Sequence, residues 1–192
     1  MLVGTLIFVS ALPFSVWSFN PLKYTQNLNT QNTDEASRAT LLGIIESCGN
    51  ATHIVDNCVV AGLNRVAQEE NNTTAKVIAA EYEEALQEGN ASLPECQIEE
   101  HMQANRIIGH CVLLMNYYAL QDQDVNSATT HYELCFQGGM QGLAYHGNIV
   151  AQFMLSELFE QKGIQGIAQG WRNALKQRKN TPEYTRLMKC YH

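Results

Sequence analysis

Histidine and cysteine side chains lie close together at two places where a metal ion could bind. His131 and Cys135 are four residues apart, so a helix would present both on one face. Cys190 and His192, at the end of the chain, could hold copper or zinc weakly. No second pair with metal-ligand spacing accompanies either site, and a disulfide at Cys135 would remove the thiolate that a metal needs. We therefore expect packing and tethering at these positions, and no metal or other cofactor.

Acid–base chemistry is suggested by Glu99 and Glu100, which directly precede His101. Adjacent residues on a helix point in different directions, so a solvated helix face is the simpler interpretation. The sequence has no nucleophile elbow, no HExxH motif and no cysteine–histidine pair with a catalytic signature, and its glycine-rich stretches lack the strand that precedes a phosphate loop. These patterns favour a non-catalytic protein. An enzyme acting on cell-wall material is a minor alternative.

The cysteines indicate a framework of disulfides. They are even in number and lie beyond the first 18 residues, as is typical of exported proteins. Two pairs flank turns: one pair encloses the turn at 123–125 and the other the turn at 49–50, so antiparallel neighbours would bring their sulfurs together. The third pair follows by elimination, while sequence alone leaves other pairings open. The expected bonds are Cys111–Cys135, Cys48–Cys58 and Cys96–Cys190.

The N-terminus supports export. Residues 1–18 form an apolar run interrupted by Pro13, which predicts a signal peptide cleaved after Ser18. No Lys or Arg precedes Lys23, so an uncleaved membrane anchor is the alternative. Export predicts a secreted or periplasmic location, with membrane contact only through this segment if it is retained. Residues 19–33, rich in Asn, Gln and Thr, predict a flexible leader, and residues 34–192 predict a single domain.

The elements that must position these residues are helices. Apolar residues recur at helical spacing, with Gly, Pro and Asn between the runs. We expect Val55 and Val77 to face the core, a capping box at 92–95 to open a long helix with a break at Gly109, and Asn126 or Ser127 to cap the next helix. The predicted fold is all-α, with helices near 35–48, 53–68, 74–89, 95–121, 127–138, 148–162, 165–179 and 182–190.

One segment carries a family resemblance. Residues 147–163 place Ile149, Phe153, Leu158 and other apolar side chains at helical spacing. Residues 75–84 and 151–160 share Ala, Glu and Glu at their first, seventh and tenth places, and their offset of 76 is twice 38, within the range of helix-pair repeats. The chain, best over 126–179, resembles a Sel1-like repeat, a variant of the tetratricopeptide helix pair. Extra residues at 138–147 depart from that pattern.

The resemblance implies a right-handed α-solenoid of antiparallel helix pairs, stapled here by disulfides, with a concave face for a protein or peptide partner. On this reading the protein is an exported, non-catalytic adaptor. The alternative is a secreted, disulfide-bonded helical-bundle ligand or inhibitor without a repeat groove. Polar or amphipathic positions on the first helices of the pairs give the candidate groove residues Asn116, Tyr117, Gln152 and Glu157.

Charge is distributed unevenly. The net charge is −7, but from residue 162 onward seven basic residues stand against one acid. Such a region can steer an anionic surface or an acidic partner, or simply neutralise its own acidic body. An exported protein would seldom meet nucleic acid, so we expect no nucleic-acid partner. The candidate basic patch comprises Arg172, Lys176, Arg178, Lys179, Arg186 and Lys189.

Four asparagines begin Asn-x-Ser/Thr sequons, namely Asn50, Asn71, Asn72 and Asn90. These sequons matter only in a eukaryotic secretory route. Asn-rich capping loops would also generate several of them, so the sequence leaves their use open.

Overall fold

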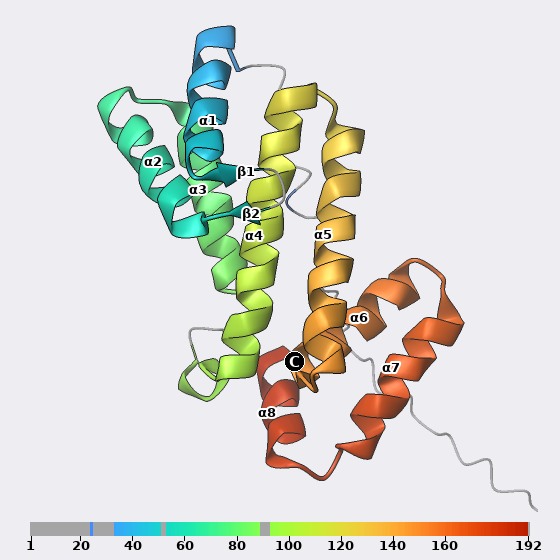
Figure 1. Ribbon diagram of the computed structural model, residues 1–192. Coiled ribbons are helices and arrows are strands. Elements are labelled where there is room, and N and C mark those ends of the chain that lie inside the picture. The colour runs from blue at the N-terminus through green and yellow to red at the C-terminus, as the bar shows by residue number, and fades with distance from the viewer. Residues whose placement is uncertain (1–23, 25–32, 51–52, 89–92, 192) are drawn as a thin grey trace, which may run out of the picture.

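The computed structural model describes residues 24, 33–50, 53–88 and 93–191 (Figure 1). Their helical structure confirms the predicted all-α class. The expected signal peptide lies outside the described residues, as does the expected leader except Tyr24 and Thr33. The helices are α1 Glu35–Ser47, α2 Asp56–Glu69, α3 Thr73–Leu86, the 3₁₀ turn η3 Pro94–Cys96, α4 Glu99–Asp122, α5 Val125–Tyr145, α6 Ile149–Gln161, α7 Gln165–Gln177 and α8 Pro182–Tyr191.

A two-residue antiparallel ladder interrupts the chain between α1 and α2. It joins β1, Gly49–Asn50, to β2, His53–Ile54. The second helix therefore begins at Asp56, three residues later than predicted. Val55 precedes that helix in an extended conformation and is 51% exposed, so its prediction as a core residue is wrong. Val77 is also exposed, because it lies on the outer face of α3.

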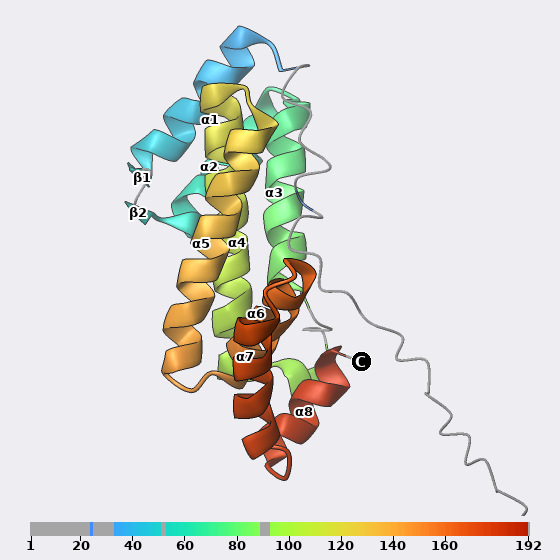
Figure 2. The same cartoon turned by 90° about the vertical axis from the view of Figure 1, so that its right-hand side faces the viewer.

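The long α4–α5 hairpin forms the middle of the molecule, as two perpendicular views show (Figures 1 and 2). Helices α1, α2 and α3 pack beside it, and α6, α7 and α8 gather at one end. One hydrophobic cluster joins the C-terminal helices to α4, and another joins α1, α2 and α3 to α4. Ile108 and Met115 of α4 belong to the first cluster, and Leu113 and Leu120 to the second. Helix α4 is thus apolar around most of its circumference because it serves both cores.

Asparagine and aspartate side chains begin four of these helices. Asn72 accepts a hydrogen bond from the Ala75 amide at 3.0 Å and so caps α3. Asp124, rather than Asn126 or Ser127, caps α5 and accepts from the amides of both of those residues. Its carboxylate satisfies amides that have no partner within the helix. Ser92 of the expected capping box lies outside the described residues, Pro94–Cys96 form the short η3, and α4 starts at Glu99.

Two predicted helix boundaries at glycine are wrong. Helix α4 continues through Gly109, and α5 continues through Gly138 and Gly139 to Tyr145. Gly109 and Gly139 instead allow helices to approach closely. A β-carbon at Gly109 would lie 2.9 Å from the Tyr82 ring on α3. The turn after α5 uses Gly147, whose φ is +90°.

Three disulfides join the six cysteines in the expected pairing, of which two bonds followed from spacing and the third by elimination. The bonds are Cys48–Cys58, Cys96–Cys190 and Cys111–Cys135, with Cα–Cα distances of 5.6, 5.7 and 5.6 Å. Such a framework indicates an oxidising compartment, because the cytosol keeps thiols reduced. Within the described part of the chain, no helix combines the length and apolar character needed to cross a membrane.

Candidate functional site

The predicted groove residues do not line an open groove. Asn116 is buried and donates from Nδ2 to Glu81 Oε2 and to the Val112 carbonyl, both at 3.0 Å. Tyr117 is buried as well, and Gln152 is buried with its Nε2 3.1 Å from the Ala144 carbonyl. Glu157 is half-buried. Three of the four side chains are therefore core residues, because α4 and α6 are covered by neighbouring helices on the faces that carry them.

The candidate basic patch is spread over α7, α8 and the turn between them, and its three arginines have partners within the molecule. Arg172 forms an ion pair with Glu160, and Arg186 lies 3.7 Å from Glu183. Arg178 donates to the Gly147 carbonyl at 2.6 Å. The other three side chains are exposed, and they are Lys176, Lys179 and Lys189.

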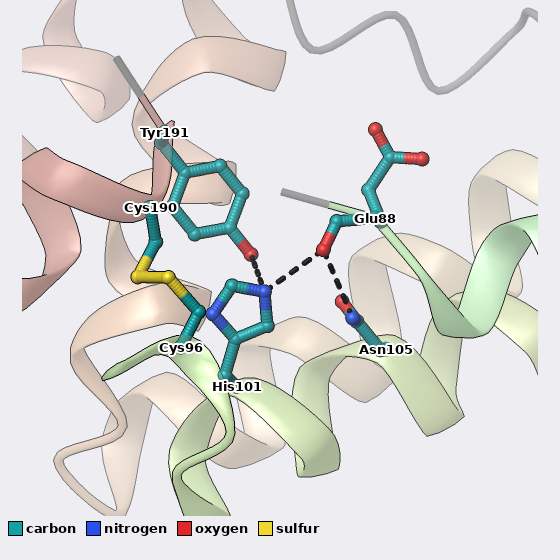
Figure 3. The surroundings of a disulfide bond; sticks show 6 residues. All are labelled: Glu88, Cys96, His101, Asn105, Cys190 and Tyr191. Carbon is teal, nitrogen blue, oxygen red and sulfur yellow. Dashed lines mark hydrogen bonds between the residues drawn. A yellow bond between two sulfur atoms is a disulfide. The ribbon is translucent and has the colours of Figure 1, made fainter. Parts of the chain in front are cut away.

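A buried polar cluster closes the C-terminal end of α3 (Figure 3). We call Glu88, His101, Asn105 and Tyr191 the His101 cluster. His101 Nε2 lies 2.8 Å from the Glu88 carbonyl oxygen, and Asn105 Nδ2 lies 3.0 Å from the same oxygen and 3.0 Å from the Leu86 carbonyl. The last carbonyls of a helix have no partner within it. Two side chains of α4 therefore complete the hydrogen bonding at the end of α3.

The contact with a carbonyl fixes the protonation of His101. A carbonyl oxygen only accepts, so Nε2 must carry a hydrogen and donate it. The Tyr191 hydroxyl lies 3.2 Å from the same nitrogen, and the two rings stack with centroids 5.0 Å apart. Burial lowers the pKa of His101, and the Glu88 carbonyl and carboxylate oppose that shift in part. His101 is thus a neutral donor within the core, and Nε2 cannot act as a general base.

This finding corrects the expectation of a solvated face at 99–101. Glu99 is exposed, but His101 is 1% exposed. The Cys96–Cys190 bond places Tyr191 against His101, since Cys190 and Tyr191 are adjacent in α8 (Figure 3). The cluster therefore holds together the end of α3, the start of α4 and the end of α8.

Tyr24 joins this region from the segment expected to be a flexible leader. Its ring is 1% exposed, and its hydroxyl donates to Glu88 Oε2 at 3.0 Å. It lies 6.3 Å from the Tyr132 ring on α5. Burial, reinforced by the nearby Glu88 carboxylate, raises the pKa values of Tyr24, Tyr132 and Tyr191, so all three remain protonated. The predicted leader thus contains one buried side chain, and no periodic signal in the sequence marks it.

The candidate metal ligands serve other purposes. Cys135 is bonded to Cys111 and has no thiolate to offer. His131 stacks on Tyr118, with ring centroids 3.4 Å apart. Over the residues that the structure describes, no group of three or more His, Cys, Asp or Glu side chains is arranged to hold a metal ion. Cys190 is in a disulfide, and His192 lies outside the described residues.

An apolar strip on the outer side of α7 is the best candidate for a binding surface. Ile164 and Ile167 are exposed, and Trp171 is half-buried one turn further along. Positions 164, 167 and 171 share one helix face. Tyr145, at the end of α5, is 78% exposed and packs its ring 5.5 Å from that of Trp171. We call these four residues the α7 strip. Its helical spacing is visible in the sequence, but its exposure is not.

Comparisons with protein-family models, curated proteins and solved structures gave no match to this chain. The similarity to Sel1-like repeats therefore stays a prediction that depends on the residues quoted above. The class of protein that the fold defines is a disulfide-bonded, all-α protein.

Proposed function

We propose that this protein is an exported, non-catalytic adaptor that acts through protein–protein contacts. The three disulfides support a secreted or periplasmic location, because they persist in oxidising compartments. Successive helix hairpins, α4–α5 and α6–α7, are compatible with the Sel1-like resemblance. The partner surface in this proposal is the α7 strip rather than the groove first expected.

The observation that carries the proposal is an aromatic pair in which the exposed Tyr145 packs against the half-buried Trp171. Single exposed apolar residues are common on proteins, but contiguous apolar patches mark interaction sites. Tyrosine, tryptophan and arginine are the residue types that dominate binding energy at protein interfaces. The strip holds both aromatic types, and Arg178 lies beside it, bonded to the turn that follows Tyr145.

The chemistry of the partner follows from the charges at the C-terminal end of the strip. Lys176 and Lys179 are exposed where α7 ends. A segment with an apolar side chain beside acidic residues would match both the apolar strip and the two exposed lysines. The proposed partner is therefore an acidic protein or peptide segment with an apolar anchor, and its binding weakens as salt is added.

Replacing Tyr145 tests this proposal. Tyr145 is mostly solvent-exposed, so Tyr145→Ala is expected to leave the fold intact while lowering partner affinity about tenfold or more, a loss of roughly 1.4 kcal/mol or greater. The measurement uses the full chain as bait on secretions of the producing cells, followed by titration of each captured protein with wild type and variant.

Val55→Ala is the matched control, because Val55 is also an exposed apolar residue and lies in the other half of the molecule. Capture that depends on Tyr145 and not on Val55 supports the proposal. Capture that is equal for wild type and both variants contradicts the assignment of the α7 strip.

A second candidate function is a secreted helical-bundle ligand or inhibitor. The burial of Asn116, Tyr117 and Gln152 favours it, because these residues then offer no groove to a peptide. The two functions differ in stoichiometry. An adaptor holds two proteins in a ternary complex, whereas a ligand or inhibitor forms a complex with one target, and light scattering on purified complexes distinguishes them.

A further inference from the structure

Two overlapping sequons span the turn between α2 and α3 and the first two residues of α3. They are Asn71-Asn72-Thr73 and Asn72-Thr73-Thr74, and all four residues are described. The other sequons, at Asn50 and Asn90, include residues outside the described part of the chain. Two large glycans cannot readily be placed on adjacent asparagines, so the geometry of this turn bears on which asparagine accepts one.

Asn71 presents its side-chain amide to solvent. It is exposed, and its backbone has φ +50°, a left-handed conformation that asparagine tolerates in turns. Its Oδ1 accepts from Lys76 Nζ at 2.6 Å, whereas its Nδ2 donates to no described residue. N-glycosylation uses Nδ2 and leaves Oδ1 in place. The modified residue could therefore keep its contact with Lys76.

The Asn72 side chain, in contrast, helps to hold the fold together. It is half-buried, and its Oδ1 caps α3 through the Ala75 amide at 3.0 Å. The hydroxyl of its sequon, Thr74 Oγ1, is hydrogen-bonded to Thr33 Oγ1 at 3.1 Å, next to the start of α1. A sugar on Asn72 would therefore start from a half-buried side chain, whereas one on Asn71 would start from an exposed side chain. Thr73, which completes the sequon of Asn71, is exposed.

We propose that Asn71 is an N-linked glycosylation site and that Asn72 is not. In the reaction, Asn71 Nδ2 bonds to the anomeric carbon of an oligosaccharide carried on a lipid diphosphate, and the proton that Nδ2 loses is balanced by the departing diphosphate. The bond between that carbon and the diphosphate oxygen breaks, and the lipid diphosphate leaves. The α2–α3 turn and α7 lie at opposite ends of the molecule in both views (Figures 1 and 2). The glycan therefore leaves the α7 strip uncovered, and this inference does not depend on the proposed partner.

Direct mapping of the site tests the proposal. The full chain is secreted from a eukaryotic cell line, and its glycans are removed by a peptide N-glycosidase in water labelled with heavy oxygen. This treatment converts each glycosylated asparagine to a labelled aspartate, which peptide fragmentation locates. Label on residue 71 and none on residue 72 is the expected result. Label on residue 72, or none on either, overturns the proposal.

Two threonine variants give an independent check. Thr73→Ala destroys the sequon of Asn71 and leaves Asn72-Ala-Thr74 intact, whereas Thr74→Ala spares the sequon of Asn71. We expect Thr73→Ala to abolish label in the turn and Thr74→Ala to retain it at the wild-type level. Transfer of the label to residue 72 in Thr73→Ala would refute the exclusion of Asn72. Intact mass, which reports three disulfides, and circular dichroism verify that both variants fold.

Discussion

His101 shows how a titratable side chain can be essential to packing without doing acid–base chemistry. It lies in the first turn of α4, yet its ring points at the end of α3 and donates to the Glu88 carbonyl. Asn105, one turn later, supports the same carbonyl. A buried acceptor without a donor costs about 1–3 kcal/mol. The two residues therefore stabilise the junction where α3 ends and the chain turns into η3.

The stability of the protein should fall as the pH drops below about 6.5, the ordinary pKa of histidine. Burial lowers the pKa of His101 in the folded state, so the unfolded chain binds a proton at a pH where the folded chain does not. The His101 contribution is complete above the unfolded pKa and is lost as the pH falls toward the folded pKa. Urea unfolding at pH 7.5, 6.5 and 5.5 measures the free energy of unfolding.

His101→Gln is expected to flatten this pH dependence and to lower stability at pH 7.5 by about 1–3 kcal/mol. His146→Gln, at an exposed position, tests whether the loss of any histidine has the same effect. Equal pH slopes in wild type and His101→Gln would contradict the assignment.

At the residue scale, the sequence predicted all three disulfides, two from local geometry and Cys96–Cys190 by elimination, but it missed a hydrogen bond that depends on the tertiary fold. The Cys48–Cys58 and Cys111–Cys135 bonds could be anticipated because each encloses one turn. The bond between Tyr24 and Glu88 joins residues 64 positions apart. No spacing rule connects a tyrosine in a polar segment with a glutamate beyond the end of a helix.

At the element scale, glycine was the main source of error. Glycine is unfavourable in helices because it loses much backbone entropy on folding. The sequence therefore suggested a break at Gly109 and an end at Gly138 and Gly139. The helices continue because packing across α3, α4 and α5 outweighs that cost. Binary patterning predicted that the helices exist, but their ends and exposed faces required the neighbouring helices to be known.

Gly138 and Gly139 offer a matched pair of substitutions in one helix. A β-carbon at Gly138 meets nothing within 4 Å, so Gly138→Ala should stabilise the protein by about 0.5–1 kcal/mol through helix propensity. At Gly139 the added carbon would lie 2.6 Å from Ile107 Cγ2 on α4. Gly139→Ala should therefore be less stable than Gly138→Ala by at least about 1 kcal/mol. Thermal and urea unfolding measure the difference, and equal gains would show that α5 can shift away from α4.

At the scale of the whole molecule, two hydrophobic clusters share α4, and each half carries its own disulfide. Cys48–Cys58 lies beside the core of α1, α2 and α3, while Cys96–Cys190 ties the end of the chain to the segment before α4. Cys111–Cys135 fastens the central hairpin. Cys48–Cys58 thus closes a short loop of the chain, whereas Cys96–Cys190 closes a long one.

Removal of the disulfides should affect stability in the order of the loops that they close. The paired residues are separated by 94 positions in Cys96–Cys190 and by 10 in Cys48–Cys58. The chain-entropy model then makes the double variant C96A/C190A less stable than C48A/C58A by about 2 kcal/mol. Cys111–Cys135, with a separation of 24, should lie between them. Urea unfolding of the three double variants checks the order, and equal losses at the short and long loops would contradict it.

Because Tyr24 is buried, the stability of the protein depends on how far its N-terminus is trimmed by proteases. Cleavage after Ser18 would leave the ring attached, but an exopeptidase that digests past residue 24 would remove a core side chain while sparing helices α1 to α8 and the three disulfides. Tyr132 would lose one aromatic neighbour while Phe136 remains, and Glu88 would lose the hydroxyl that donates to it. A ragged N-terminus would therefore divide a preparation into two populations of unequal stability, and recombinant versions should start ahead of residue 24.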